Sequence, residues 1–274
     1  MFVAAVLIGC LVLIVCLLPR VTRESSPDRG DQPSFFEPPR KTAAVPQLPA
    51  AKAFPKTIAF LDVETTGLST RDRIVTLGVV LINTDELQAA QANCKCLHRI
   101  YDPGIKCHPE AKGIHGHNDW TLRHQPFFAE EAEEVREFLE RAGLICCHHA
   151  EFDLGFVNRE LLQAGLKPLS KPAFCTMRAY KRHNSGSASL DHIAARLGLH
   201  RTTKWHGALE DAFLTANVFL ALNQFSGRIP VPDRLAHSFG FQNFRVVPPL
   251  PEGPLPLRKR RPRASIQTRV ETGV

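Results

Sequence analysis

The chain has few cysteines for its length, eight among 274 residues, and two of them, Cys10 and Cys16, lie inside an apolar N-terminal run. Eight are too few for a scaffold built on disulfide bonds, so we expect reduced, buried thiols in a cytoplasmic domain. One alternative is a zinc site with the ligands Cys94, Cys96, Cys107 and His108. Cys-x-Cys followed by Cys-His does not match the usual paired spacing of zinc ligands, so the sequence favours buried thiols.

The composition is not extreme, since 44% of the residues are hydrophobic and 22% are charged. These fractions are typical of folded globular proteins and exclude collagen-like, coiled-coil and wholly disordered chains. The length allows one domain with long tails or two small domains. No internal repeat is visible in the sequence.

Charged residues are absent from residues 2–18, and a helix of this length would span about 26 Å, close to the thickness of a bilayer core. Arg20 and Arg23 follow the run, as the positive-inside rule expects of an uncleaved anchor. We therefore predict a transmembrane anchor over residues 1–18, with the rest of the chain in the cytoplasm. Two alternatives stay open: a signal peptide that is removed, and a soluble cytoplasmic product that lacks this helix.

Proline-rich segments flank a central block with regular periodicity. Residues 19–56 are predicted to be a linker, residues 57–225 a folded domain, and residues 226–274 a tail with a basic run at 258–263. The net charge is +7, but the central block holds 18 basic and 20 acidic residues, so the excess lies in the flanking segments. The basic run is either a solvated cluster or a contact for phosphates of anionic lipid or nucleic acid.

The central block alternates between strand-like and helix-like patterns. The pattern predicts strands at 57–63, 74–82, 96–101 and 144–148, and helices at 130–141, 152–164, 190–197 and 207–223. The last helix has a packing face at helical spacing, formed by Leu209, Ala212, Phe213, Ala216, Phe219 and Leu220. The fold class is therefore mixed α/β.

Asp62 and Glu64 stand two residues apart near the end of the first predicted strand, so their carboxylates point to one face of the sheet. Desolvating two carboxylates is costly unless cations or hydrogen bonds replace the water. Divalent metal is the usual solution for such a pair. The alternative is that both acids cap the exposed end of the strand.

Three further residues stand at the ends of predicted elements. Asp153 begins the helix after the strand at 144–148, and Asp211 lies one turn into the last helix, five residues after His206. Acids at neighbouring strand and helix ends can converge. Taken singly, Asp153 is better explained as an N-terminal cap, and His206 is more often an ordinary polar residue than a catalyst.

Together these residues resemble the DEDDh family of 3′-5′ exonucleases, which includes the proofreading (epsilon) subunit of bacterial DNA polymerase III. The first family motif is matched by residues 60–68, the second by 148–153 and the third by 206–211, in the family's order. The stretch Ile114-His115-Gly116 matches a short family segment between the first two motifs. The resemblance covers residues 57–225 and leaves both tails unexplained.

The resemblance implies a ribonuclease H-like fold with a mixed sheet flanked by helices. It also implies two Mg²⁺ or Mn²⁺ ions held by Asp62, Glu64, Asp153 and Asp211. In the family mechanism, one ion activates a water and the other stabilises the leaving 3′ oxygen, while the equivalent of His206 takes the proton. A second branch of the family uses tyrosine instead, but Tyr101 and Tyr180, the only tyrosines here, lie outside the third motif.

By the same resemblance, a pocket for the terminal nucleotide would be formed by Thr65, Thr66, Leu68, His115 and Phe152. Each has an alternative reading: Thr65 and Thr66 as a capped turn, for example, or Phe152 as core. One departure is visible, since the family's second motif usually reads His-Asn-Ala where this chain has His148-His149-Ala150. The metal carboxylates are unaffected by this change.

The expected function is a metal-dependent exonuclease that releases 5′-mononucleotides from the 3′ ends of single-stranded DNA or RNA. One alternative keeps the chemistry but makes the chain the proofreading partner of a DNA polymerase. Residues 32–36 are faintly similar to a peptide that binds a sliding clamp. The other alternative is a catalytically idle nucleic-acid-binding module, which the filled catalytic positions disfavour.

Overall fold

The computed structural model of the chain describes residues 54–88, 94–201, 204–225, 228–230 and 245–258. The predicted anchor at 1–18, most of the linker at 19–56 and much of the tail at 226–274 lie outside these residues. Within the described residues, no helix combines the length and apolar character needed to cross a bilayer.

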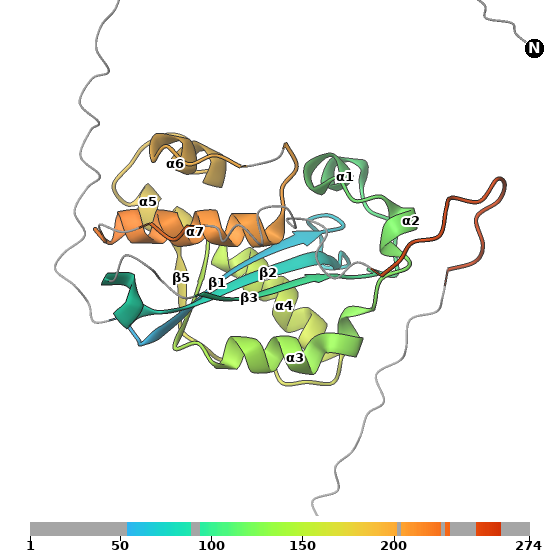
Figure 1. The fold of residues 1–274 in the computed structure, drawn as a ribbon, viewed down its shortest axis with the longest axis horizontal. Coiled ribbons are helices and arrows are strands. Elements are labelled where there is room, and N and C mark those ends of the chain that lie inside the picture. Colours follow the sequence, from blue (N-terminus) through green and yellow to red (C-terminus); the bar gives the residue numbers. More distant parts are fainter. Residues whose placement is uncertain (1–53, 89–93, 202–203, 226–227, 231–244, 259–274) are drawn as a thin grey trace, which may run out of the picture. The chain divides into compact units, whose positions relative to one another are not determined.

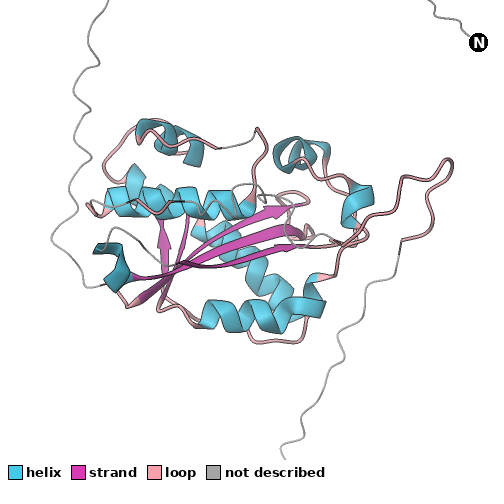
Figure 2. Ribbon diagram, in the orientation of Figure 1, coloured by secondary structure: helices cyan, strands magenta, loops and turns pink. Residues whose placement is uncertain are grey.

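A five-stranded mixed sheet forms the centre of the fold, in the order β3-β2-β1-β4-β5 (Figures 1 and 2). The strands are β1 (Thr57–Thr65), β2 (Ile74–Asn83), β3 (Cys94–Ile100), β4 (Leu144–Cys147) and β5 (Ala173–Cys175). β1, β2 and β3 are antiparallel neighbours, whereas β4 pairs parallel to β1 and β5 parallel to β4. The central strands are apolar because both faces of the sheet are covered by helices.

One face of the sheet is covered by α7 (Ala208–Leu222), the orange helix of Figure 1. Ile58 and Phe60 of β1 and Val80 of β2 pack against it in one buried cluster. The six apolar residues predicted to form the packing face of this helix all belong to that cluster. The prediction of this face is therefore confirmed.

The opposite face is covered by α3 (Phe128–Glu140) and α4 (Ala150–Gln163). Ala59, Leu61 and Val63, which alternate with the residues facing α7, belong to the buried cluster of this side. A buried ion pair also joins α4 to the sheet, since Nε of Arg73 donates to Oε1 of Glu160 at 2.6 Å. The C-terminal part of α4 is thereby fixed against the start of β2.

Shorter helices complete the domain. α5 (Thr176–Lys181) and α6 (Leu190–Arg196) pack on the outer side of α7 through Tyr180, Ile193 and Val218. α1 (Pro109–His115) and α2 (Asp119–Leu122) lie between β3 and α3 in the chain, and a 3₁₀ helix, η1 (Thr84–Gln88), follows β2.

The structure corrects several predicted bounds and adds elements. The strand predicted at 96–101 runs from Cys94 to Ile100, and the strand at 144–148 ends at Cys147. β5, α1, α2 and α5 were not predicted, because elements of three to seven residues are too short to show a period. The mixed sheet with flanking helices agrees with the expected fold class.

Candidate active site

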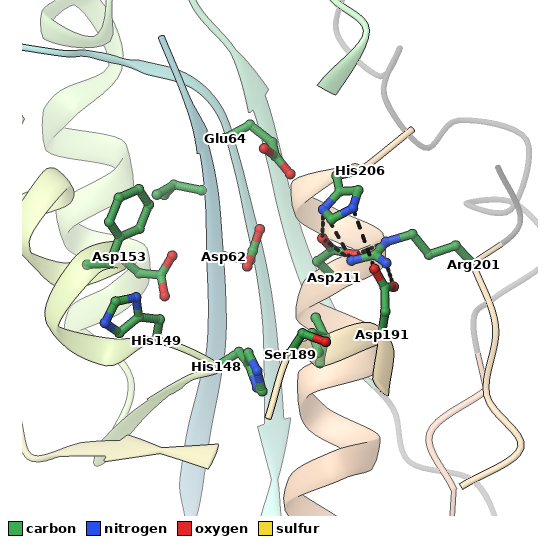
Figure 3. A pocket seen from close by; sticks show the side chains of 13 residues that line it. Asp62, Glu64, His148, His149, Asp153, Ser189, Asp191, Arg201, His206 and Asp211 are labelled. Atoms are coloured by element: carbon green, nitrogen blue, oxygen red, sulfur yellow. Dashed lines mark hydrogen bonds and ion pairs between the residues drawn. The ribbon is translucent and has the colours of Figure 1, made fainter. Parts of the chain in front are cut away.

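β1 carries the two acids of the first motif beyond the end of β4. The parallel pairing stops where Phe60 meets Cys146, so the last residues of β1 extend beyond the paired part of β4. Asp62 and Glu64 follow Ile58 and Phe60 at a spacing of two residues and therefore lie on the same, α7 side of the sheet. The gap beside β1 leaves both carboxylates accessible from a pocket (Figure 3).

The turn from β4 into α4 brings Asp153 into this gap. His148 holds the turn, since its Nδ1 lies 2.8 Å from Oγ1 of Thr176 and its Nε2 lies 2.9 Å from the carbonyl oxygen of Ala188. Asp153 follows in the first turn of α4 and is only 3% exposed. Its carboxylate hydrogen bonds to the backbone of Val63, beside Asp62. The second motif therefore meets the first at the unpaired edge of β1.

Asp211 comes from the other side, in the first turn of α7. This approach depends on Gly78, which pairs with Asp62 in the sheet register. A Cβ atom at Gly78 would lie 2.3 Å from the backbone of Ala208 and Leu209. The missing side chain thus lets the helix touch the sheet and places Asp211 opposite Asp62.

His206 stands just before α7 and is held by its backbone and its ring. Its amide donates to the carbonyl of Ile114 at 3.0 Å. Its ring lies between two acids, with Nδ1 3.5 Å from Asp211 and Nε2 3.7 Å from Asp191. Burial lowers the pKa of His206 below its ordinary value, outweighing the opposite effect of Asp211. The imidazole is therefore neutral at neutral pH and can accept a proton.

The segment 114–116 is thus part of the frame around His206. Gly116 has a φ of +72°, and a Cβ there would lie 2.7 Å from the ring of Trp205. The positive φ and the close contact both require glycine at this turn.

The carboxylates of the pocket interact strongly with one another. Burial, followed by repulsion from Asp153 and Asp211, raises the pKa of Asp62 well above its usual range. Burial raises the pKa of Glu64 to about 8, with repulsion from Asp211 next. Burial also raises the pKa of Asp153 to about 8, against the effect of its backbone hydrogen bonds. Such mutual repulsion is relieved when a cation binds.

The carboxylate oxygens and the imidazole nitrogens of the pocket suit a divalent metal ion. Among the described residues, one group of possible ligands lies within 4.8 Å of one another: Glu64, His206 and Asp211. Oδ2 of Asp153 is buried and has no hydrogen-bond partner in the described part of the chain, as expected of an oxygen that binds a metal ion. Carboxylate oxygens are the ligands that Mg²⁺ and Mn²⁺ favour. The alternative zinc ligands Cys94, Cys96, Cys107 and His108 form no such group in this part of the chain.

The five residues predicted to form the nucleotide pocket lie in different surroundings. Phe152 lines the pocket and stacks on His149, with ring centroids 5.7 Å apart and an interplanar angle of 9°. Leu68 is 86% exposed on the loop after β1.

The other three predicted residues make hydrogen bonds outside the pocket lining. Thr65 donates to the carbonyl of Gly67, and Thr66 donates to the carboxylate of Asp72. His115 is buried and accepts from the amide of His117. Contact of these residues with a nucleotide stays a prediction.

Several residues of the site have no counterpart in the sequence prediction. The pocket is also lined by Ser189, Leu190, Asp191 and Arg201, which come from α6 and the segments on either side of it. α6 itself follows from its apolar period, but only the tertiary packing brings its first turn to the pocket. No local signal in the sequence marks Asp191 or Arg201 as site residues.

The metal-free protein is expected to become less stable as pH rises from about 5 to about 8. The pKa of Glu64 and that of Asp153 are near 8 in the folded chain, against 4.5 and 3.8 for the free groups. The folded state therefore binds more protons than the unfolded state in this window, and linkage makes the free energy of unfolding fall with rising pH.

Melting temperatures in EDTA at several pH values measure this slope, and Asp153→Asn should flatten it because one of the titrating groups is removed. Saturating Mn²⁺ should raise the melting temperature most at the alkaline end. An Asp153→Asn slope equal to that of the wild type would contradict the assignment.

Comparison with known proteins agrees with this geometry. Residues 59–219 match the family model described as RNase T exonuclease. DNA polymerase III subunit epsilon of Escherichia coli (strain K12) is 32% identical over 176 residues, which are 59% of this chain and 69% of that protein. The subunit of the same name from Buchnera aphidicola (subsp. Schizaphis graminum, strain Sg) is 28% identical over 202 residues, which are 69% of this chain and 83% of that protein.

Among solved structures, the nuclease domain of 3′hExo, described as a DEDDh family member bound to rAMP, aligns with a TM-score of 0.53 and 17% identity. The alignment covers 67% of this chain and 99% of that chain, and it shows the shared fold. Since the exonuclease model spans more than half of the sequence, the chain belongs to the RNase T exonuclease family and is a 3′-5′ exonuclease.

Proposed function

We propose that the chain removes 5′-mononucleotides one at a time from the 3′ end of single-stranded DNA or RNA, with two Mg²⁺ or Mn²⁺ ions. The proposal rests on one observation above all: Asp62, Glu64, Asp153 and Asp211 converge on one pocket beside the ring of His206. Once ionised, the four carboxylates carry a charge of −4, which two divalent ions would neutralise before a substrate phosphate arrives.

Bound metal would lower the pKa of the attacking water and stabilise the leaving 3′ oxygen. The remaining tasks fall to side chains of the protein. His206 takes the proton of the attacking water, for which its lowered pKa and its position at the pocket suit it. The Ile114 carbonyl and the two flanking acids keep the ring in place.

Phe152 supports the proposed preference of the enzyme for the 3′ end of a single strand. Its ring lies at the pocket, is half-buried and stacks on His149, so a base could extend this stack. Aromatic platforms bind unstacked bases with little regard for sequence. A base inside a duplex is stacked on its neighbours and would have to leave them to reach this ring.

The proposal is tested by incubating the protein with Mg²⁺ or Mn²⁺ and 5′-labelled single-stranded DNA and RNA oligonucleotides. We expect a ladder of products shortened from the 3′ end, which EDTA and Asp62→Ala abolish. Absence of the ladder with both substrates, or equal activity of Asp62→Ala, would overturn the proposal.

A second candidate role, proofreading for a DNA polymerase, is favoured by the similarity to DNA polymerase III subunit epsilon. It keeps the same chemistry and adds a protein partner. Co-purification of a polymerase or a sliding clamp with the full chain would support this role. Recovery of the active chain with neither would leave a stand-alone nuclease.

A further inference from the structure

Arg201 occupies the pocket in a way that the exonuclease reaction does not require. Among the side chains that line the pocket, it alone carries a fixed positive charge. Its Nε donates to Oδ1 of Asp211 and its Nη2 to Oδ2, each at 2.8 Å (Figure 3). Both side chains are almost fully buried, with 9% and 4% of their surfaces exposed. Arg201 and Asp211 thus form a bidentate, desolvated ion pair.

The same guanidinium also engages the other groups on this side of the pocket. Nη1 contacts the carboxylate of Asp191, whose side chain is 58% exposed at the rim. Nη2 lies 3.3 Å from Nδ1 of His206. A single cation therefore bridges a buried acid, a rim acid and the histidine.

Asp211 is also a member of the group that could hold metal with Glu64 and His206. Both of its oxygens are already bonded to Arg201, and Oδ2 additionally faces His206 at 3.5 Å. A divalent ion and a guanidinium cannot take the same lone pairs of one carboxylate, and two cations in contact repel each other. Because Arg201 takes one lone pair of each Asp211 oxygen, metal that binds at Asp211 competes with this ion pair.

We propose that Arg201 is a built-in counter-cation of Asp211, which divalent metal must displace, so that Arg201 sets the metal concentration at which the site fills. Asp191 gives the displaced guanidinium a second carboxylate at the rim. This inference rests on the proposed metal-dependent function.

The test is a titration of the full chain with Mn²⁺, followed by calorimetry and by the emission of Trp205 and Trp120. Arg201→Gln should bind Mn²⁺ about tenfold more tightly or better, because a buried charged hydrogen-bond pair no longer competes. Arg201→Lys should lie between Arg201→Gln and the wild type, since an ammonium group cannot form the bidentate pair.

Lys204→Gln is the matched control, since it removes the same charge three residues away, where Nζ lies 4.6 Å above the ring of Trp205. We expect it to change Mn²⁺ affinity less than twofold. In EDTA, Arg201→Gln should melt below the wild type, because the carboxylates lose their counter-cation, and saturating Mn²⁺ should remove this difference.

Equal Mn²⁺ affinity of Arg201→Gln and the wild type would overturn the proposal, as would an equal gain in Lys204→Gln, which would reflect only general charge. If the wild type binds no Mn²⁺, tight binding by Arg201→Gln supports the displacement, and no binding by either overturns it. Oligonucleotide cleavage by the wild type in the same preparation separates a failure of this proposal from a failure of the exonuclease function.

Discussion

Asp62→Asn is expected to reduce exonuclease turnover by about 10³-fold or more while the metal-free protein keeps or gains thermal stability. Asparagine has nearly the same shape as aspartate but carries no charge, so the affinity for divalent metal falls. In EDTA the same change removes a carboxylate whose pKa is raised by burial and by its acidic neighbours. The repulsion between the remaining carboxylates should therefore decrease.

The measurement pairs oligonucleotide cleavage with melting temperatures in EDTA and in Mg²⁺. Glu151→Gln is a suitable control, because this acid lies in the first turn of the same helix as Asp153 but is 71% exposed and pairs with Arg178 at the surface. It should retain both activity and stability. Cleavage by Asp62→Asn within tenfold of the wild type, or a clear loss of stability in EDTA, would contradict the assignment.

Gly78→Ala is expected to destabilise the domain by about 1–3 kcal/mol and to lower turnover by about 10²-fold. The added Cβ would lie 2.3 Å from the backbone of Ala208 and Leu209, which no side-chain rotation can relieve. The first turn of α7 must therefore move away from β2, and Asp211 moves with it relative to Asp62.

Denaturant unfolding and cleavage assays on the same variant check this result. Gly155→Ala provides the control, since a Cβ at this position in α4 would meet no atom of the described residues within 4 Å. Alanine there should stabilise the helix by about 0.5–1 kcal/mol and leave cleavage unchanged. Wild-type turnover in Gly78→Ala would show that Asp211 does not depend on this close contact.

The carboxylates and the histidine could be predicted because each lies in a short motif that serves as a local signature, although Asp153 and His206 give no clear signal when taken singly. Asp62 and Glu64 alternate along a strand, Asp153 and Asp211 follow the start of a periodic helix, and their order matches the family motifs. These signals survive in the sequence because they depend on residues close together in the chain.

The rest of the site depends on tertiary contacts that leave no such signature. Gly78 is important only because β1 and β2 pair in a register that puts it opposite Asp62 and beneath α7. Ile114 supports His206 with a backbone carbonyl, which any residue could supply. Arg201 is one of many basic residues, and only the folded chain shows that its charge is buried beside Asp211.

Two of the four carboxylates belong to helix N-termini, and this has an electrostatic consequence. Asp153 lies in the first turn of the 14-residue α4, and Asp211 in the first turn of the 15-residue α7. The aligned peptide dipoles of each helix act as roughly half a positive charge at this end. Both helices therefore direct positive potential at the pocket from the backbone itself. Unlike a bound ion, this potential cannot dissociate, and it helps the domain to hold four acids together before any metal arrives.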